Sequence, residues 1–159
     1  MKKILILISL VVGCTPKPTE FDGIKQWSAV ELLRNQHKDE LSEWEILQLA
    51  VMLKESRFNP NAVGSCDDRG VYQITRPYLN EVNRLSEKNY THDDAFDIAK
   101  SIEMFAIVQG RYNKDKDIHE AIKHHNPGAG AGYEREILRN MQTIRQYEEI
   151  RKLLLAYGK

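Results

Sequence analysis

Apolar residues recur every three or four positions in most segments of the chain, which is the spacing of one face of an α-helix. Gly, Pro, Asn, Asp and Ser gather between these segments and indicate loops. The pattern predicts helices over residues 24–36, 43–57, 77–85, 93–110 and 118–124, and a last helix from residue 133 onward. The chain has no internal repeat and its polar loops are short, so these helices are expected to form one domain.

The helix over residues 43–57 has the clearest boundaries. Residues 42–45 have the sequence Ser-Glu-Trp-Glu, a capping box in which the serine and the second glutamate each accept a backbone N–H of the other. The helix is expected to end at Glu55 or Arg57, before Asn59-Pro60, because the residue that precedes a proline is pushed out of the α region. Glu55 is therefore predicted at the end of a buried helix.

Residues 59–70 are rich in Asn, Pro, Gly, Ser and Asp and predict a loop. A short extended piece is expected over residues 71–74, and a second loop, rich in glycine, over residues 126–132. Asp93 or Asp94 is expected to cap the helix over residues 93–110. The residues of that helix expected to face the core are Phe96, Ala99, Ile102, Ala106 and Gln109.

The N-terminal segment differs from the rest of the chain. Lys2 and Lys3 precede an apolar run that is too short to span a bilayer as a helix, which is the pattern of a secretory signal. The run ends in Val-Val-Gly-Cys at residues 11–14, which resembles the lipobox of bacterial lipoproteins. The resemblance implies that residues 1–13 are removed and that Cys14 is lipidated and attaches the protein to a membrane.

Residues 14–23 include Pro16 and Pro18 among polar residues and are expected to form an extended tether. Thr15 stands where an aspartate would, by resemblance to the sorting rule of enteric bacteria, retain a lipoprotein in the inner membrane. The expected location is therefore the cell envelope, with a lipid anchor in the outer membrane facing the periplasm.

Composition is that of a globular protein, with 42% hydrophobic and 29% charged residues. Without residues 1–13 the chain keeps 21 basic residues against 23 acidic ones, a net charge of −2, so no nucleic acid is expected as a partner. Cys66 is the only cysteine besides Cys14, so no intramolecular disulfide is expected in the mature chain.

Three stretches carry the candidate chemistry. Residues 55–62 have the sequence Glu-Ser-Arg-Phe-Asn-Pro-Asn-Ala, residues 70–74 Gly-Val-Tyr-Gln-Ile, and residues 125–128 His-Asn-Pro-Gly. They resemble the Glu-Ser-x-Phe-Asn-Pro-x-Ala, Gly-Leu-Met-Gln and Tyr-Asn-Ala-Gly signatures of the lysozyme-like lytic transglycosylases. The resemblance extends from about residue 41 to residue 133, and it implies a mostly α domain of lysozyme-like α+β class over residues 24–159, with a cleft and at most a short β-element near residues 70–75.

The resemblance implies that Glu55 is the catalytic acid, with a pKa raised by desolvation so that it stays protonated until it donates to the glycosidic oxygen. It implies cleavage of the β-1,4 bond between N-acetylmuramic acid and N-acetylglucosamine in peptidoglycan glycan strands, with a 1,6-anhydro product and no cofactor. The residues expected to contact substrate are Ser56, Tyr72, Gln73, His125 and Asn126. No metal is expected, because His124 and His125 are adjacent on a helix and point in different directions.

Two departures from the family pattern leave alternatives open. His125 replaces the family's tyrosine and would couple the site to its own protonation. Asp67-Asp68-Arg69 replaces the family's Gly-Ala before the second stretch, and Asp68 resembles an aspartate of goose-type lysozymes that supplies a second carboxylate for hydrolysis. The alternatives are therefore a hydrolase that uses Asp68, or a peptidoglycan-binding lipoprotein without activity.

Overall fold

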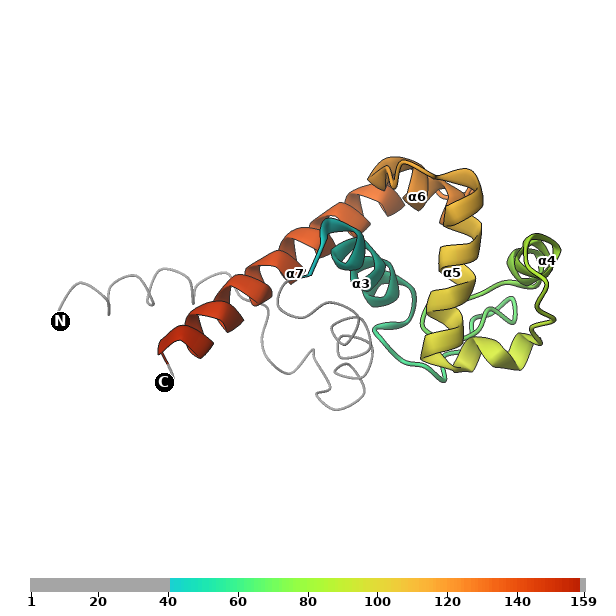
Figure 1. Cartoon of the computed structure of the whole chain (residues 1–159), viewed down its shortest axis with the longest axis horizontal. Helices are drawn as coiled ribbons and strands as arrows, with labels where there is room; N and C mark the ends of the chain where they lie inside the picture. The colour runs from blue at the N-terminus through green and yellow to red at the C-terminus, as the bar shows by residue number, and fades with distance from the viewer. Residues whose placement is uncertain (1–40, 158–159) are drawn as a thin grey trace.

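The computed structural model describes residues 41–157, which are mostly helical (Figure 1). In chain order these are α3 (Glu43–Ser56), α4 (Arg76–Leu85), the 3-10 helix η3 (His92–Phe96), α5 (Ile98–Tyr112), α6 (Ile118–His125) and α7 (Ala131–Tyr157). The mostly α fold class is confirmed. The predicted helix over residues 24–36, the signal over 1–13 and the tether with Cys14 lie outside the described residues.

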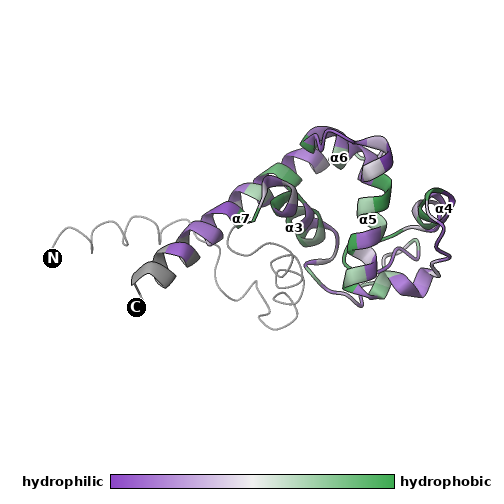
Figure 2. Ribbon diagram, in the orientation of Figure 1, coloured by the Kyte–Doolittle hydropathy of each residue, from purple (hydrophilic) through white to green (hydrophobic). Residues whose placement is uncertain are grey.

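Helix α3 is the central element of the fold. The Ser42 hydroxyl accepts the Glu45 N–H at 3.3 Å and the Glu45 carboxylate accepts the Ser42 N–H at 2.6 Å, which confirms the predicted capping box. Every side chain from Glu45 to Met52 is buried. A helix buried on all sides must be enclosed by other elements, and Figure 2 shows hydrophobic residues concentrated on α3 where it lies beside α7.

The end of α3 at Ser56 agrees with the prediction, but proline is not its cause. Arg57 and Phe58 both adopt left-handed backbone conformations, with φ of 52° and 61°, and turn the chain before it reaches Pro60. Positive φ values are strained for residues with side chains. Phe58 is 4% exposed and packs in the core, so its burial holds this turn in place.

The segment from Arg57 to Thr75 folds into a compact loop beside the end of α3. Isolated antiparallel bridges join Arg69 to Val63 and to Ile74, and Gly70–Gln73 is a turn. The expected extended piece over residues 71–74 is therefore wrong, and the β-element near residue 70 is limited to these bridges. The reason lies in two positive φ values, 74° at Gly70 and 50° at Gln73. A Cβ on Gly70 would lie 1.7 Å from the Ala95 carbonyl oxygen of η3, so only glycine fits there.

Helix α5 begins later than predicted. Asp97 caps it by accepting the Lys100 N–H at 3.0 Å, whereas Asp93 and Asp94 belong to η3, where Asp94 forms a capping box with Thr91. The face of α5 that meets the core is also rotated from the predicted one. Ile102 and Gln109 are buried as expected, Phe96 lies before the helix and is half-buried, and Ala99 and Ala106 are exposed.

Helix α7 packs mainly along α3 and extends beyond it (Figure 1). Ile137 and Met141 are buried against the core, and Leu138 and Ile144 pack at its edge. An ion pair of 2.6 Å between Lys54 and Glu136 joins the two helices near the end of α3. Within residues 41–157 no helix has the length and hydrophobicity to cross a membrane.

Candidate active site

Glu55 lies in the last turn of α3, and its carboxylate meets side chains from two other helices. Its side chain is 17% exposed. The Tyr133 hydroxyl, from the first turn of α7, donates a hydrogen bond to Oε1, and His125 Nε2, from the last residue of α6, lies 3.5 Å from the same oxygen. These contacts fix one carboxylate oxygen between α6 and α7.

Two opposing influences act on the pKa of Glu55. Burial is the largest and raises it, whereas the hydrogen bonds and charge of His125, the Tyr133 hydroxyl and the charge of Lys54 lower it. Together, His125, Tyr133 and Lys54 lower the pKa of Glu55 by more than burial raises it, so this pKa lies below its ordinary value. The prediction of a raised pKa is therefore wrong, because the hydrogen bonds and charges of these neighbours outweigh desolvation. Burial and the adjacent Glu55 charge raise the pKa of Tyr133.

His125 is enclosed by aromatic rings. Its side chain is 5% exposed, and ring centroids of Tyr72, Tyr78 and Phe105 lie 6.0, 5.8 and 5.8 Å from its own. Among the described residues, Nδ1 is buried without a hydrogen-bond partner. Glu55 is thus the polar group that the imidazole faces.

The Ser56 and Gln73 side chains bond to backbone within the loop. Ser56 Oγ lies 3.0 Å from the Val71 carbonyl oxygen and 3.2 Å from that of Met52, so its hydrogen ties the end of α3 to the turn. Gln73 Nε2 donates to Gly70 O at 2.9 Å and to Ala62 O at 3.3 Å. Contact of either side chain with substrate stays a prediction. Ser56 holds the loop against the helix that carries Glu55, whereas Gln73 holds parts of the loop to each other.

Tyr72 does not face a substrate surface. Its side chain is fully buried, its ring stacks on Phe105 with centroids 4.9 Å apart, and its hydroxyl donates to Gln48 Oε1 at 3.1 Å. The expected contact of Tyr72 with substrate is therefore corrected. The Tyr72 ring lies 6.0 Å from the His125 ring and so packs beside His125 within the core.

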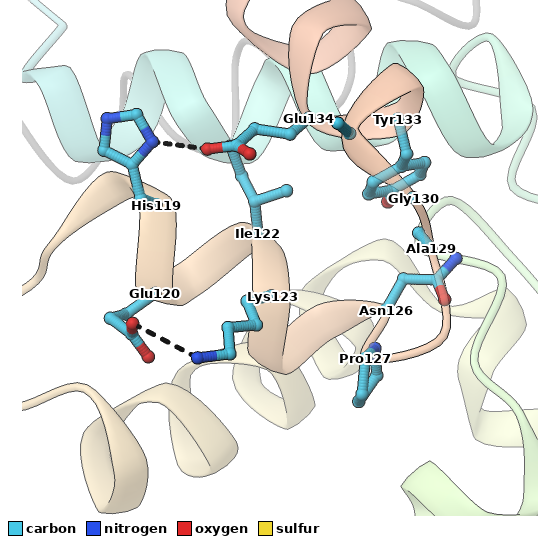
Figure 3. A pocket seen from close by; sticks show the side chains of 11 residues that line it. His119, Glu120, Ile122, Lys123, Asn126, Pro127, Ala129, Gly130, Tyr133 and Glu134 are labelled. Carbon is cyan, nitrogen blue, oxygen red and sulfur yellow. Dashed lines mark hydrogen bonds and ion pairs between the residues drawn. The ribbon is translucent and has the colours of Figure 1, made fainter.

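Asn126 is exposed and lines a hollow of about 420 Å³ beside the site (Figure 3). The hollow lies between α6, the loop that follows it and the first turn of α7. His119 pairs with Glu134 and Lys123 with Glu120 on its walls, as Figure 3 shows. Other lining residues include Pro127, Ala129, Gly130 and Tyr133. Since the Tyr133 hydroxyl reaches Glu55, this tyrosine connects the hollow to the carboxylate.

The two loop aspartates differ in their surroundings. Asp67 pairs with Arg69 at 2.8 Å and Arg76 at 3.0 Å, lies 3.5 Å from His92 Nδ1, and has a pKa lowered chiefly by its hydrogen bond with Arg69. Asp68 is half-buried beside Gly64 and forms no ion pair with any residue in 41–157. Asp67 is thus a structural anchor, whereas no ion pair within residues 41–157 holds the Asp68 carboxylate.

The described part of the chain contains no candidate set of metal ligands. Among residues 41–157, no group of three or more His, Cys, Asp and Glu side chains is arranged to hold an ion. The one described cysteine, Cys66, is exposed on the loop.

Tyr133 is the site residue that the motifs did not identify. It lies 78 positions from Glu55, and outside the three stretches. Its spacing nevertheless contained a signal, because Tyr133, Ile137 and Met141 are separated by four and share one helix face. A tyrosine on a core-facing stripe needs a partner for its hydroxyl, and a carboxylate at the facing helix end supplies it.

This combination of helical fold and enclosed glutamate agrees with a comparison against protein families. Residues 33–149 match the family model of the transglycosylase SLT domain. Because the match covers most of the chain, the protein belongs to this family, whose members act on peptidoglycan and cleave its glycosidic bonds. No curated protein and no solved structure matches the chain.

Proposed function

We propose that this protein is a peptidoglycan lytic transglycosylase in which Glu55 serves as both acid and base. The observation that carries the proposal is the position of the Glu55 carboxyl, partly exposed at the end of the central helix and held on one oxygen by residues of α6 and α7. The Oε2 atom remains to meet a glycosidic oxygen. Held in this way, the carboxyl can exchange a proton with substrate without first reorienting.

The proposed reaction uses one carboxyl group and no water. Glu55 donates its proton to the oxygen that links N-acetylmuramic acid to N-acetylglucosamine, and the C1–O bond breaks as the proton arrives. The substrate's own N-acetyl group stabilises the positive charge at C1. The Glu55 carboxylate then takes the proton of the C6 hydroxyl as that oxygen bonds to C1, which forms the 1,6-anhydro ring and returns Glu55 to its protonated state.

Digestion of purified sacculi tests this assignment. The full-length chain in detergent is expected to release muropeptides whose muramic acid ends are lighter by one water than reducing ends, as measured by mass spectrometry. Glu55→Gln keeps the size of the side chain but cannot donate the proton, so product release is expected to fall to background. Glu87→Gln, at an exposed position between α4 and η3, is the matched control and should digest at the wild-type rate.

The same digestion separates the two alternatives. Reducing ends that disappear in Asp68→Asn would show a hydrolase with Asp68 as the second carboxylate. A chain that sediments with sacculi but releases nothing, with or without Glu55, would be a binding protein. Anhydro ends that persist in Asp68→Asn support the single-carboxylate reaction.

We further propose that the enzyme works while anchored by a lipid on Cys14 in the outer membrane, facing the periplasm. The support is the order of basic residues, apolar run, glycine and cysteine at the N-terminus. In a Gram-negative host, Cys14→Ala is expected to abolish incorporation of labelled fatty acid. Labelling that survives this substitution would refute the anchor.

A further inference from the structure

The side chain of His125 is poorly placed to touch a glycan and well placed to act on Glu55. It is 5% exposed, whereas Glu55 is 17% exposed, so the imidazole is the more enclosed of the two groups. Its Nε2 lies 3.5 Å from Oε1, and Nδ1 has no partner among the described residues. The single polar contact of the buried ring therefore points at the proposed acid.

Two negative groups lie close to this ring. His125 is the last residue of α6, where the partial negative charge of the helix C-terminus attracts cations. The Glu55 carboxylate adds a full negative charge.

The elements packed around the pair bring mainly hydroxyl groups and an apolar ring to it. The turn contributes the Tyr72 hydroxyl, α4 that of Tyr78 and α5 only the apolar Phe105. On α7 the Tyr133 hydroxyl faces Glu55, and Lys54 of α3 acts on Glu55 but is paired with Glu136 of α7. No described carboxylate other than Glu55 faces the imidazole.

We propose that His125 is a positioning residue for Glu55 whose positive charge favours the carboxylate and thereby confines the proton-donating form of Glu55 to acidic conditions. This inference rests on the proposed function of Glu55. The reaction needs Glu55 protonated at its start, and an imidazolium 3.5 Å away opposes that state. A side chain of similar size without charge would let Glu55 keep its proton to higher pH.

The test is the pH profile of anhydro-muropeptide release by the full-length chain. In wild type, the rate is expected to decline on the alkaline side as Glu55 loses its proton. In His125→Gln, which keeps an N–H donor, and in His125→Phe, which keeps the aromatic packing, that decline is expected at higher pH than in wild type. The position of the decline does not depend on how much of a variant is folded.

His124→Gln is the matched control, since it removes the neighbouring imidazole. That ring is 28% exposed, lies 3.6 Å from Glu120 and contacts Tyr112 rather than Glu55, so its substitution should leave the profile in place. The inference would be overturned if the pH profiles of both His125 variants, each scaled to its own maximum rate, superimposed on the wild-type profile. An equal shift of the profile in His124→Gln would also overturn it. Failure of the proposed function is distinguishable, because Glu55→Gln would then remain active.

Discussion

At the residue scale, Glu55 occupies an unusual place for a carboxylate. The C-terminal end of a helix carries partial negative charge, which disfavours an acidic side chain there. His125, Tyr133 and the positive charge of Lys54 compensate for this, and each of them lowers the pKa of Glu55 against the effect of burial. The site thus depends on three residues from three helices to accommodate one acidic group.

Tyr133→Phe tests the contribution of one of these residues. The substitution removes the hydroxyl that holds Glu55 but keeps the ring in the wall of the hollow. A hydrogen bond to a charged group contributes about 1.5–3 kcal/mol, so a loss of activity of about tenfold or more is expected. Because Tyr133 lowers the pKa of Glu55, the alkaline decline of the pH profile should also move to higher pH.

Tyr147→Phe on the same helix is the control for that substitution. Tyr147 is 38% exposed and lies about four turns further along α7, away from Glu55. Sacculus digestion by this variant should match wild type. If both variants lose activity equally, the effect belongs to α7 as a whole, and the Tyr133 hydroxyl has no specific part in it.

At the element scale, α3 is stabilised at its start by a cap and carries Glu55 at its other end. Ser42→Ala removes one half of the capping box and leaves a backbone N–H without its partner. The free energy of unfolding is expected to fall by about 1 kcal/mol, measured by urea denaturation. Ser65→Ala, at an exposed loop position, should leave it unchanged.

Ser42→Ala should leave the specific activity of the folded molecules unchanged. Glu55 is positioned by the end of α3, where Arg57 and Phe58 turn the chain and Ser56 bonds to Val71 O. These contacts do not involve the first turn of the helix. A large loss of activity at full folding would show that α3 transmits changes at its start to the site.

Local pattern was sufficient to predict the helices, because capping residues and helical spacing act over a few positions. The capping box at Ser42 and the end of α3 are predicted in this way, and the start of α4 at Arg76 lies one residue from the predicted start at Pro77. The turn at Gly70–Gln73 and the start of α5 are not predicted in this way, because they depend on contact of the loop with η3. Glu55 and His125 were named from motifs, whereas Tyr133 becomes a site residue only when α7 packs along α3.

At the scale of the whole molecule, charged pairs link several elements to one another. Glu43 pairs with Arg145 across α3 and α7, and Glu81 accepts a hydrogen bond from Tyr112 across α4 and α5. Asp94 of η3 pairs with Lys100 of α5 at 2.5 Å. The described carboxylates with lowered pKa values are Glu43, Glu55, Asp67, Glu81, Asp94 and Glu103. Acid should therefore weaken contacts throughout the fold.

The expected result is a melting temperature that falls with pH in the acidic range. Hydrogen bonds with Arg84 and Lys100 hold the pKa values of Glu81 and Asp94 at about 2, below ordinary values of 4.5 and 3.8. A carboxylate with a lowered folded-state pKa stabilises the fold above its unfolded-state pKa, and this contribution is lost as pH falls through the folded-state pKa. Thermal unfolding followed by circular dichroism should therefore show a loss between about pH 5 and about pH 2.

Salt provides the control, because most of these pairs are exposed and are screened at high ionic strength. At about 1 M salt the acid-induced drop in melting temperature is expected to be smaller. A melting temperature that stays constant down to about pH 2 would show that the pairs contribute little to the fold. The result also bears on His125, because the lowered pKa of Glu55 puts the alkaline decline of activity in the same acidic range as this loss of stability. The melting temperature of each His125 variant, measured across that range, therefore separates a change at Glu55 from acid unfolding.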